Sequence, residues 1–513
     1  MRILLTAMNA KYVHTNLALR YLRASIRPDV AEITLKEFTI NESLRRIAGE
    51  IFEEKAEVIG FSCYIWNIRQ MGELIRLLRP VCPGVRFVLG GPEVSYNAEE
   101  WLEKLDVDAI VRGAGEETFR ELLSAWRSGG ALDSVAGVTW RQGERVRSNP
   151  ARRAAQSLDQ LPLPYEEDED LNGRLAYLET ARGCPFQCQY CLSSAENGLS
   201  LSDPEVFRHN YRRLMECGAT TVKLVDRTFN AERTRALRIL DIAKEEAERY
   251  PGKKVRLHCE IAGELLDQAW YDYLAAYPEG LVQLEIGVQS THPPALQAIQ
   301  RRQHFTRWAH WVRELRRHTD IHLHLDLIAG LPLEGWPEFR NSFNDVYALT
   351  PQRLQLGFLK VLRGSGLYQR REEWGLVYSP DPPYTILQTA WLSYVEIVQL
   401  ERIEELVERY YNSGRFTLTL HEAVSLRASA FDLFNDLARF WRQRGWFKRA
   451  WKSTALYQNI WEYLDTLTCA PAQRARLLAA LRADYERCER SGHLPEFLVS
   501  TRGISEQHEQ KEK

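Results

Sequence analysis

The stretch LAYLETARGCPFQCQYC, residues 175–191, joins a short apolar strand to a loop that carries three cysteines within eight residues. Cys184, Cys188 and Cys191 have the spacing CxxxCxxC. Thiolates are soft ligands that suit zinc or iron. The chain has only nine cysteines in 513 residues, an odd number that cannot pair completely. A close group of this kind therefore indicates a metal site in preference to a disulfide framework.

Two kinds of metal centre are open to this loop. A structural zinc ion takes four protein ligands, usually as two spaced pairs, but the nearest further candidates are His209 and Cys217 on the next predicted helix. A four-iron cluster held by three cysteines leaves one iron free to bind something else. The lack of a fourth cysteine favours the cluster, and zinc stays as the alternative.

The segment that begins with this strand alternates short apolar strands with helices. Six strands are expected, at residues 175–180, 221–226, 255–261, 281–290, 321–331 and 353–362. Strands separated by helices predict a parallel sheet, and six such units predict a partial TIM-type (β/α)6 barrel over residues 173–382. Within 281–290, Leu284 and Ile286 alternate with Glu285 and Gln289, so the polar face should turn into the barrel.

The N-terminal part, residues 1–147, shows the same alternation of strands and helices. Its expected strands are residues 2–8, 32–38, 58–66, 86–91 and 108–113. They predict an α/β, doubly wound domain of the Rossmann or flavodoxin-like type, in which ligands bind at the carboxyl ends of the strands. The small and polar residues at those ends are Asn9, Ser62, Gly90, Gly91 and Gly115. Glycine turns also begin helices in any such sheet, so a purely structural role is equally open.

The remaining segments have different compositions. Residues 148–172 are rich in Pro, Arg and acidic residues and predict a linker. Residues 383–500 have a helical pattern with many aromatic residues, which predicts an all-α C-terminal domain packed through them. The tail, 501–513, is polar and is expected to be disordered.

Composition argues against several classes of protein without excluding nucleic acid as a partner. There are 67 basic and 69 acidic residues, so no basic field favours nucleic acid as a partner. No run approaches the roughly 20 apolar residues of a membrane helix, and the start MRILLTAMN is too short for a signal peptide. We therefore expect a cytoplasmic protein without a membrane partner, and the charge balance is compatible with a small-molecule substrate.

The cysteine loop resembles that of the radical S-adenosylmethionine (SAM) superfamily, in which CxxxCxxC with an aromatic residue before the third cysteine, here Tyr190, follows the first strand of a partial barrel. The resemblance implies that the three cysteines ligate a 4Fe-4S cluster whose open iron binds SAM. Reductive cleavage of SAM would then give a deoxyadenosyl radical, with flavodoxin or ferredoxin as electron donor.

Other segments resemble the same superfamily. LVDRTFN, residues 224–230, lies where the family carries an acidic segment near SAM, although the usual GGE is missing. EIGVQS (285–290) and DLIAGLP (326–332) look like segments of oxygen-independent coproporphyrinogen oxidases. The SAM contacts that the resemblance implies are Tyr190, Asp226, Glu260 and Gln289.

The N-terminal domain resembles the cobalamin-binding domain of one radical SAM subclass. The match rests on NAKYVHTNLALRYL (9–22) and on the turns GGPEV (90–94) and GAGEETF (113–119). It implies that Asn9, His14, Ser62, Gly90, Gly91 and Gly115 contact cobalamin. The DxHxxG signature that supplies a histidine ligand to cobalt elsewhere is absent, so the resemblance implies a cofactor held by backbone turns; a packing role for His14 is as plausible as a contact.

The resemblance implies a cobalamin-dependent radical SAM enzyme, most simply a methyltransferase that acts on an unactivated carbon of a small molecule. Two alternatives remain open: a radical rearrangement or cyclisation that uses cobalamin without methyl transfer, and, from another class, a zinc-stabilised binding protein.

Overall fold

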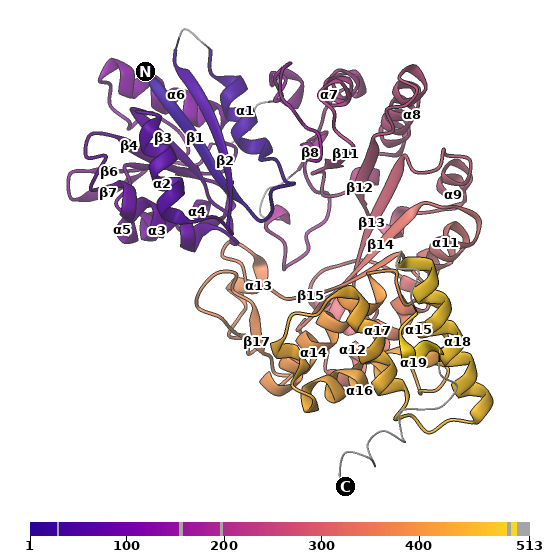
Figure 1. The fold of residues 1–513 in the computed structure, drawn as a ribbon. Coiled ribbons are helices and arrows are strands. Elements are labelled where there is room, and N and C mark those ends of the chain that lie inside the picture. Colours follow the sequence, from indigo (N-terminus) through magenta and orange to yellow (C-terminus); the bar gives the residue numbers. More distant parts are fainter. Residues whose placement is uncertain (28–29, 153–156, 195–197, 490–493, 500–513) are drawn as a thin grey trace.

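The computed structural model describes residues 1–27, 30–152, 157–194, 198–489 and 494–499, so the predicted disordered tail lies outside the described residues. An N-terminal sheet domain stands beside a second sheet with helices on its outer side, and a helical region closes the chain (Figure 1). Within the described part, no helix is both long and apolar enough to cross a membrane.

The N-terminal sheet has seven strands in the order β2-β1-β3-β4-β5-β6-β7. They are β1 (Arg2–Asn9), β2 (Glu32–Thr39), β3 (Val58–Ser62), β4 (Arg86–Gly90), β5 (Ala109–Val111), β6 (Val138–Gln142) and β7 (Arg145–Ser148). The first five are parallel, which confirms the doubly wound prediction. The last two form an antiparallel hairpin at the edge that was not predicted.

Helices cover both faces of this sheet because its buried strands carry apolar residues on alternate sides. Ile3 and Leu5 face one cluster, and Leu4 and Met8 face the other. One face is covered by α1 (Leu17–Ser25) and α6 (Glu116–Ser128), the other by α2 (Leu44–Glu53), α3 (Ile68–Leu78), α4 (Pro92–Ser95) and α5 (Ala98–Lys104).

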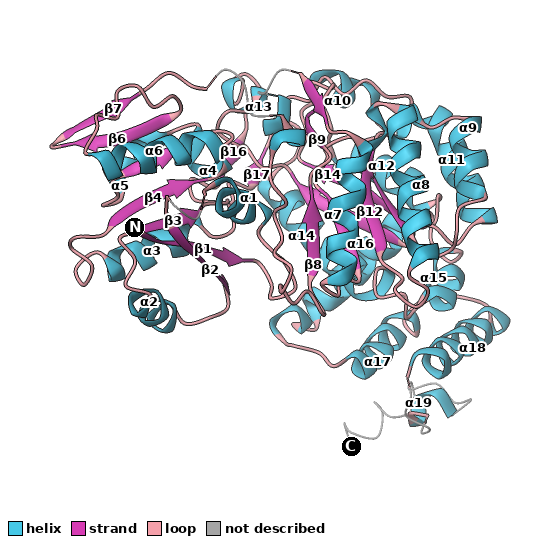
Figure 2. Ribbon diagram, turned by 90° about the horizontal axis from the view of Figure 1, so that it is seen from above, coloured by secondary structure: helices cyan, strands magenta, loops and turns pink. Residues whose placement is uncertain are grey.

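The second sheet has six parallel strands in the order β15-β14-β13-β12-β11-β8. They are β8 (Leu175–Leu178), β11 (Thr221–Leu224), β12 (Arg256–Ile261), β13 (Val282–Gln289), β14 (His322–Ala329) and β15 (Arg353–Phe358). The connecting helices are α7 (Pro204–Glu216), α8 (Arg233–Arg249), α9 (Gln268–Ala275), α10 (Pro293–Ala298), α11 (Phe305–His318) and α12 (Trp336–Tyr347) (Figure 2). This open six-stranded array is the predicted partial barrel.

The alternation along these strands has the predicted consequence. Leu284 and Ile286 are buried in the core shared with the helices, whereas Glu285 lines a pocket on the opposite face. The cysteine loop follows β8 and contains a short antiparallel pair, β9 (Ala181–Gly183) and β10 (Leu199–Leu201).

The segment between the domains packs tightly against both. Arg20 of α1 is almost fully buried and donates through Nε to Glu169 and through Nη2 to Glu37, each at 2.9 Å. Burial opposes its charge, but the two carboxylates outweigh burial and raise the pKa of the guanidinium above its usual range. The predicted linker is therefore fastened to the first domain by a buried ion-pair network.

A bridging segment, residues 359–389, leaves β15 and returns to the N-terminal domain. It contains α13 (Gly366–Gln369) and the hairpin of β16 (Val377–Tyr378) and β17 (Ile386–Gln388). Leu367 N–H donates to the carbonyl of Gln189 in the cysteine loop at 2.8 Å. Tyr384 Oη donates to Glu93, one residue after α4 begins.

The helical region follows this hairpin and begins at Tyr394. Its helices are α14 (Tyr394–Leu406), which continues into a π-helical turn at Val407–Tyr411, α15 (Thr417–Val424), α16 (Ala430–Gln443), α17 (Ser453–Leu464), α18 (Pro471–Cys488) and α19 (Glu496–Val499). Trp441 and Trp446 meet edge to face at 5.5 Å between ring centroids and belong to the same core as the barrel. The predicted aromatic packing is therefore present.

Candidate functional site

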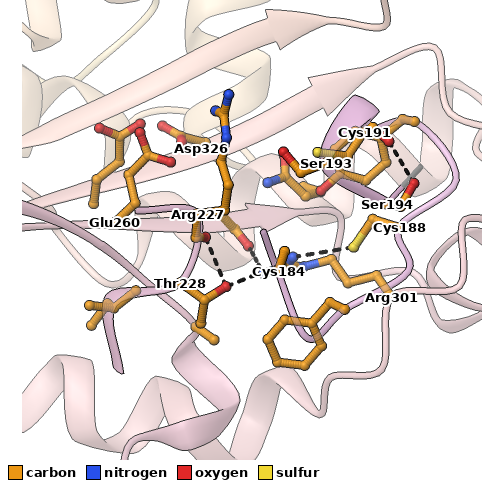
Figure 3. Close-up of a pocket in the computed structure, with 17 residues that line it drawn as sticks. Cys184, Cys188, Cys191, Ser193, Ser194, Arg227, Thr228, Glu260, Arg301 and Asp326 are labelled. Carbon is orange, nitrogen blue, oxygen red and sulfur yellow. Dashed lines mark hydrogen bonds between the residues drawn. The ribbon is translucent and has the colours of Figure 1, made fainter. Parts of the chain in front are cut away.

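The three cysteines of the loop line one pocket of about 220 Å³ at the carboxyl ends of the barrel strands (Figure 3). All three are free thiols. Cys188 is buried, and Cys184 and Cys191 are half-buried. The opposite wall is formed by strand residues, among them Glu260 and Asp326. The cysteines predicted as metal ligands are thus brought to one cavity that already carries other polar groups.

The spread of the thiols fits a cluster better than a single ion. Four ligands around one zinc ion at about 2.3 Å would bring the sulfurs within about 4 Å of one another. Among the described residues, the only three metal-binding side chains whose ligand atoms all lie within 4.8 Å of one another are His258, Glu285 and His324. The three cysteines do not form such a group. A four-iron cluster is bound at different irons and needs a wider set of thiolates. The donor set therefore fits the cluster.

Asp226 holds the beginning of the cysteine loop in place. Its carboxylate accepts the backbone N–H groups of Thr180 at 2.7 Å and Ala181 at 3.0 Å. It is fully buried, and burial raises its pKa to about 6 against the opposing effect of these hydrogen bonds. Asp226 is not among the pocket-lining residues, so the structure gives it a positioning role, and its contact with SAM stays a prediction.

Arg301, in the loop after α10, reaches the cysteines from the far side of the pocket. Its Nη2 donates to the carbonyl of Gly287 at 2.6 Å, and its Nη1 lies 3.8 Å from Cys188 Sγ. Burial raises the pKa of the Cys188 thiol, and the adjacent guanidinium opposes that effect. Arg301 therefore favours the thiolate, which is the form that ligates iron.

The other residues predicted to contact SAM lie at the same pocket. Tyr190, Glu260 and Gln289 all line it. Gln289 has φ of +66°, a strained value for a residue with a side chain, and such strain is often found at functional sites. The structure brings these residues to the cysteines, and their contacts with SAM remain predictions.

The residues predicted for cobalamin gather at the carboxyl edge of the N-terminal sheet. Asn9 and Ser62 end β1 and β3, and both are buried. Asn9 donates to the carbonyl of His14 at 2.9 Å, and Ser62 accepts from Asn16 at 3.2 Å. His14 itself shares a hydrogen bond of 2.7 Å with Tyr177 of β8, so it lies at the junction with the barrel.

The glycine turn after β4 has a backbone shape that a side chain would destroy. Gly91 has φ of +115°, and a Cβ there would lie 2.5 Å from the carbonyl oxygen of Cys63. Next to this turn, Tyr64 and Trp66 stack at 4.2 Å between ring centroids, and Trp66 is 46% exposed. Tyr12, in the loop after β1, is 71% exposed. A close-approach glycine turn flanked by exposed aromatic rings fits a large flat cofactor such as cobalamin.

Direct contacts join this edge to the cysteine loop. Gly115 precedes α6, and a Cβ at this glycine would meet Val111 and Leu22 at 3.3–3.4 Å. The next residue, Glu116, forms a 2.9 Å ion pair with Arg182 of β9. The carboxyl edge of the first sheet and the cysteine loop are therefore in direct contact.

Some functional residues were not found from the sequence. Arg301 had no signal beyond its place near EIGVQS. Asn67, which precedes α3, donates to the carbonyls of Met8 and Ser62 and so joins the ends of β1 and β3, and nothing in the sequence marks it. Trp66 could have been predicted as a candidate contact, because it ends the predicted strand 58–66 and ligands bind such sheets at the carboxyl ends of their strands.

Family models match both the N-terminal sheet domain and the barrel. Residues 3–123 match the model described as B12 binding domain, residues 178–346 match the Radical SAM superfamily, and residues 372–513 match Protein of unknown function (DUF4080). The first match ends within α6, before the hairpin of β6 and β7, and the second ends within α12, before β15. The third begins just before the hairpin of β16 and β17 and includes the C-terminal helical region.

Individual proteins show the same likeness. The cobalamin-dependent radical SAM methyltransferase TokK of Streptomyces tokunonensis is 25% identical over 86% of this chain and 78% of TokK. OxsB, a cobalamin-dependent SAM radical enzyme, is 15% identical with a TM-score of 0.66 over 94% of this chain and 79% of OxsB. TsrM of Kitasatospora setae, a radical SAM methyltransferase, is 17% identical with a TM-score of 0.61 over 74% and 76%.

The two solved structures share the fold of this chain, and the two family models fall on the two parts of its site. The cofactors of such proteins are a 4Fe-4S cluster, SAM and cobalamin, and each has a fitting set of residues here. The chain therefore belongs to the cobalamin-binding radical SAM enzymes.

Proposed function

We propose that this protein is a methyltransferase that transfers the methyl group of SAM, by way of cobalamin, to an unactivated carbon of a small molecule. The observation that carries the proposal is the contact between the carboxyl edge of the first sheet and the barrel, made by the Glu116–Arg182 ion pair and the His14–Tyr177 hydrogen bond. The similarity to TokK along most of the chain supports methyl transfer.

When bound, the cluster supplies the electron that cleaves SAM, and cobalamin carries the methyl group. The residues of the chain provide binding and orientation. Cys184, Cys188 and Cys191 would hold the cluster, and the guanidinium of Arg301 beside Cys188 favours its thiolate against the opposing effect of burial. Tyr190 would contact SAM from the cysteine loop, and Glu260 and Gln289 from the opposite wall.

The cobalamin side would be built from backbone turns and rings. Gly90 and Gly91 would allow the cofactor to approach the backbone, and Asn9, Ser62 and Gly115 shape the same edge. His14 already bonds to Tyr177, which agrees with a cofactor held without a histidine from a DxHxxG motif. We propose a cytoplasmic location and flavodoxin or ferredoxin as the source of the electron.

Incubation with SAM labelled in its methyl group tests the function. Extract from cells that lack the protein supplies candidate substrates, and the reconstituted enzyme should place the label in a new product. Deoxyadenosine without a labelled product would instead support a rearrangement or cyclisation. Cys188→Ala should lose both cluster iron and SAM cleavage, whereas Cys259→Ala, a buried cysteine outside the loop, should keep both. A colourless protein that holds zinc after reconstitution would overturn the assignment.

A further inference from the structure

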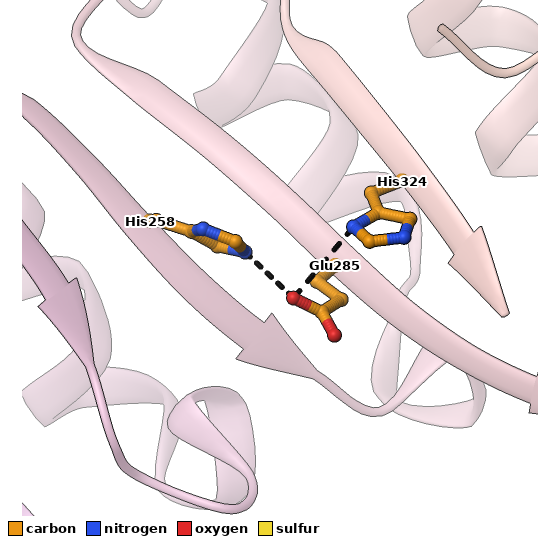
Figure 4. Close-up of side chains that lie close together, drawn as sticks. All are labelled: His258, Glu285 and His324. Atoms are coloured by element: carbon orange, nitrogen blue, oxygen red, sulfur yellow. Dashed lines mark hydrogen bonds and ion pairs between the residues drawn. The ribbon is translucent and has the colours of Figure 1, made fainter. Parts of the chain in front are cut away.

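Four titratable side chains lie on neighbouring barrel strands, and one of them, Glu285, lines the same pocket as the three cysteines. They are Lys223 of β11, His258 of β12, Glu285 of β13 and His324 of β14. Figure 4 shows the two imidazoles on either side of Glu285. His324 is 6% exposed, and the side chains of the other three are 12–20% exposed. So many ionisable groups are costly to bury unless they are paired.

Glu285 is the centre of this group. Its Oε2 accepts from His258 Nε2 at 2.8 Å and from Lys223 Nζ at 2.9 Å, and it lies 3.7 Å from His324 Nδ1. Burial opposes its charge, but the hydrogen bond from His258 and the ammonium of Lys223 outweigh burial and hold the pKa of the carboxyl below its usual range. Glu285 is therefore a fixed negative charge that orients its three neighbours.

Two of those neighbours lie beside carboxylates that line the pocket together with the three cysteines. Lys223 Nζ lies 3.0 Å from Glu260 Oε1. His324 Nε2 lies 2.9 Å from Asp326 Oδ1, but neither of these two atoms has a partner in hydrogen-bond geometry among the described residues. Glu260 is thus fixed by an ammonium that Glu285 also binds.

The same residues could be taken for a metal site, because ligand atoms of His258, Glu285 and His324 all lie within 4.8 Å of one another. The position of Lys223 argues against a metal. Its ammonium already contacts the Glu285 oxygen that the ion would need, and a cation beside this ammonium would be repelled.

We propose that Lys223 and Glu285 are positioning residues that aim Glu260 at the hydroxyl and ammonium donors of SAM. The inference deepens the proposed function and rests on it. A carboxylate that is already fixed loses little side-chain entropy when SAM binds. Removing the support should therefore weaken SAM binding while the cluster stays in place.

The experiment measures SAM binding in the complete, anaerobically reconstituted protein. SAM is titrated against the EPR spectrum of the reduced cluster, and iron, sulfide and cobalamin are counted in the same samples. Lys223→Met and Glu285→Gln remove charge with little change of shape, and Lys223→Arg restores the cation. His322→Gln is the matched control, since His322 lies two residues before His324 on the same face of β14, outside the pocket lining.

We expect wild-type cluster and cobalamin contents throughout, and a dissociation constant for SAM that rises about 10-fold or more in Lys223→Met and Glu285→Gln, the size expected for losing one charge-assisted contact. Lys223→Arg should recover most of the affinity, and His322→Gln should match wild type. Variants that bind SAM as wild type does would overturn the inference alone. Wild-type protein that has a cluster but does not bind SAM would overturn the proposed function as well. If the wild-type protein held one zinc ion per chain and His258→Asn lost it, these residues would be a metal site and the inference would be wrong.

Discussion

Asp226 accepts the backbone N–H of Thr180 at 2.7 Å, and this bond connects the end of the second barrel strand to the point where the cysteine loop begins. Asp226→Ala would leave this N–H and that of Ala181 buried without a partner, at about 1–3 kcal/mol each. We expect a lower thermal midpoint and less iron per chain after reconstitution. Asp226→Asn keeps an acceptor oxygen and should be milder. Iron content equal to wild type in Asp226→Ala would show that the loop needs no such support.

The buried carboxyl of Glu334 should make the stability of the folded protein depend on pH. Ser290 and Ser342 donate to its buried carboxyl at 2.5 and 2.8 Å, and burial raises its pKa to about 7 from an ordinary 4.5. Because the folded pKa is the higher one, the folded protein binds the proton more tightly. The stabilisation is fully present below pH 4.5 and is lost as pH rises through 7, up to about 3 kcal/mol.

Glu334→Gln should remove this dependence, since an amide does not titrate. Thermal midpoints of wild type and variant are compared at pH 5 and pH 7.5, and the variant should gain relative to wild type at the higher pH. An unchanged difference between the two proteins across this range would contradict the assignment of the proton to Glu334.

Tyr384 and Glu93 join the bridging segment to the cobalamin-binding domain. Tyr384→Phe removes the hydroxyl that Glu93 accepts from. The buried carboxyl, whose pKa burial raises to about 7, then lacks its donor. We expect faster hydrogen–deuterium exchange in residues 92–104 and 377–388. Tyr378→Phe in the same hairpin is the control, because no hydrogen bond of its hydroxyl is found within the described residues. Equal exchange in both variants would rule out a stabilising contact.

Gly91 should tolerate no side chain. A Cβ would collide with the Cys63 carbonyl, and φ of +115° is strained for any other residue. Gly91→Ala should therefore lower both the thermal midpoint and the cobalamin retained per folded chain. Gly129→Ala is the control: φ is +67° but the space is open, so the cost should be about 1 kcal/mol without loss of cobalamin. Full cobalamin retention in Gly91→Ala would refute the proposed contact.

The sequence predicted those features that depend on neighbours along the chain. Alternation of apolar residues gave the two parallel sheets, and the spacing of Cys184, Cys188 and Cys191 gave the metal-binding loop. Contacts between distant positions could not be predicted. Tyr384 and Glu93 are 291 residues apart, and no local pattern marks either one. Lys223 lies in an ordinary strand, TVKL, and its role depends on two other strands that bring Glu260 and Glu285 to it.

Boundaries were less predictable than elements. The hairpin of β6 and β7 is short, and β7 is mostly exposed and polar, so the hairpin has little of the apolar alternation that marks a strand. The helical domain was predicted to begin at residue 383. In the structure the hairpin of β16 and β17 comes first, and the helices begin at Tyr394.

The bridging segment limits how this enzyme can be divided. Through Leu367 it contacts the cysteine loop at Gln189, and through Tyr384 it contacts Glu93 beside the glycine turn. A fragment that ends with the radical SAM match at residue 346 would contain every predicted cofactor ligand, yet would lose both contacts and the last strand, β15. The region that matches a family of unknown function thus contacts the cobalamin-binding domain through Tyr384, and an exchange of catalytic modules between relatives would have to carry it along.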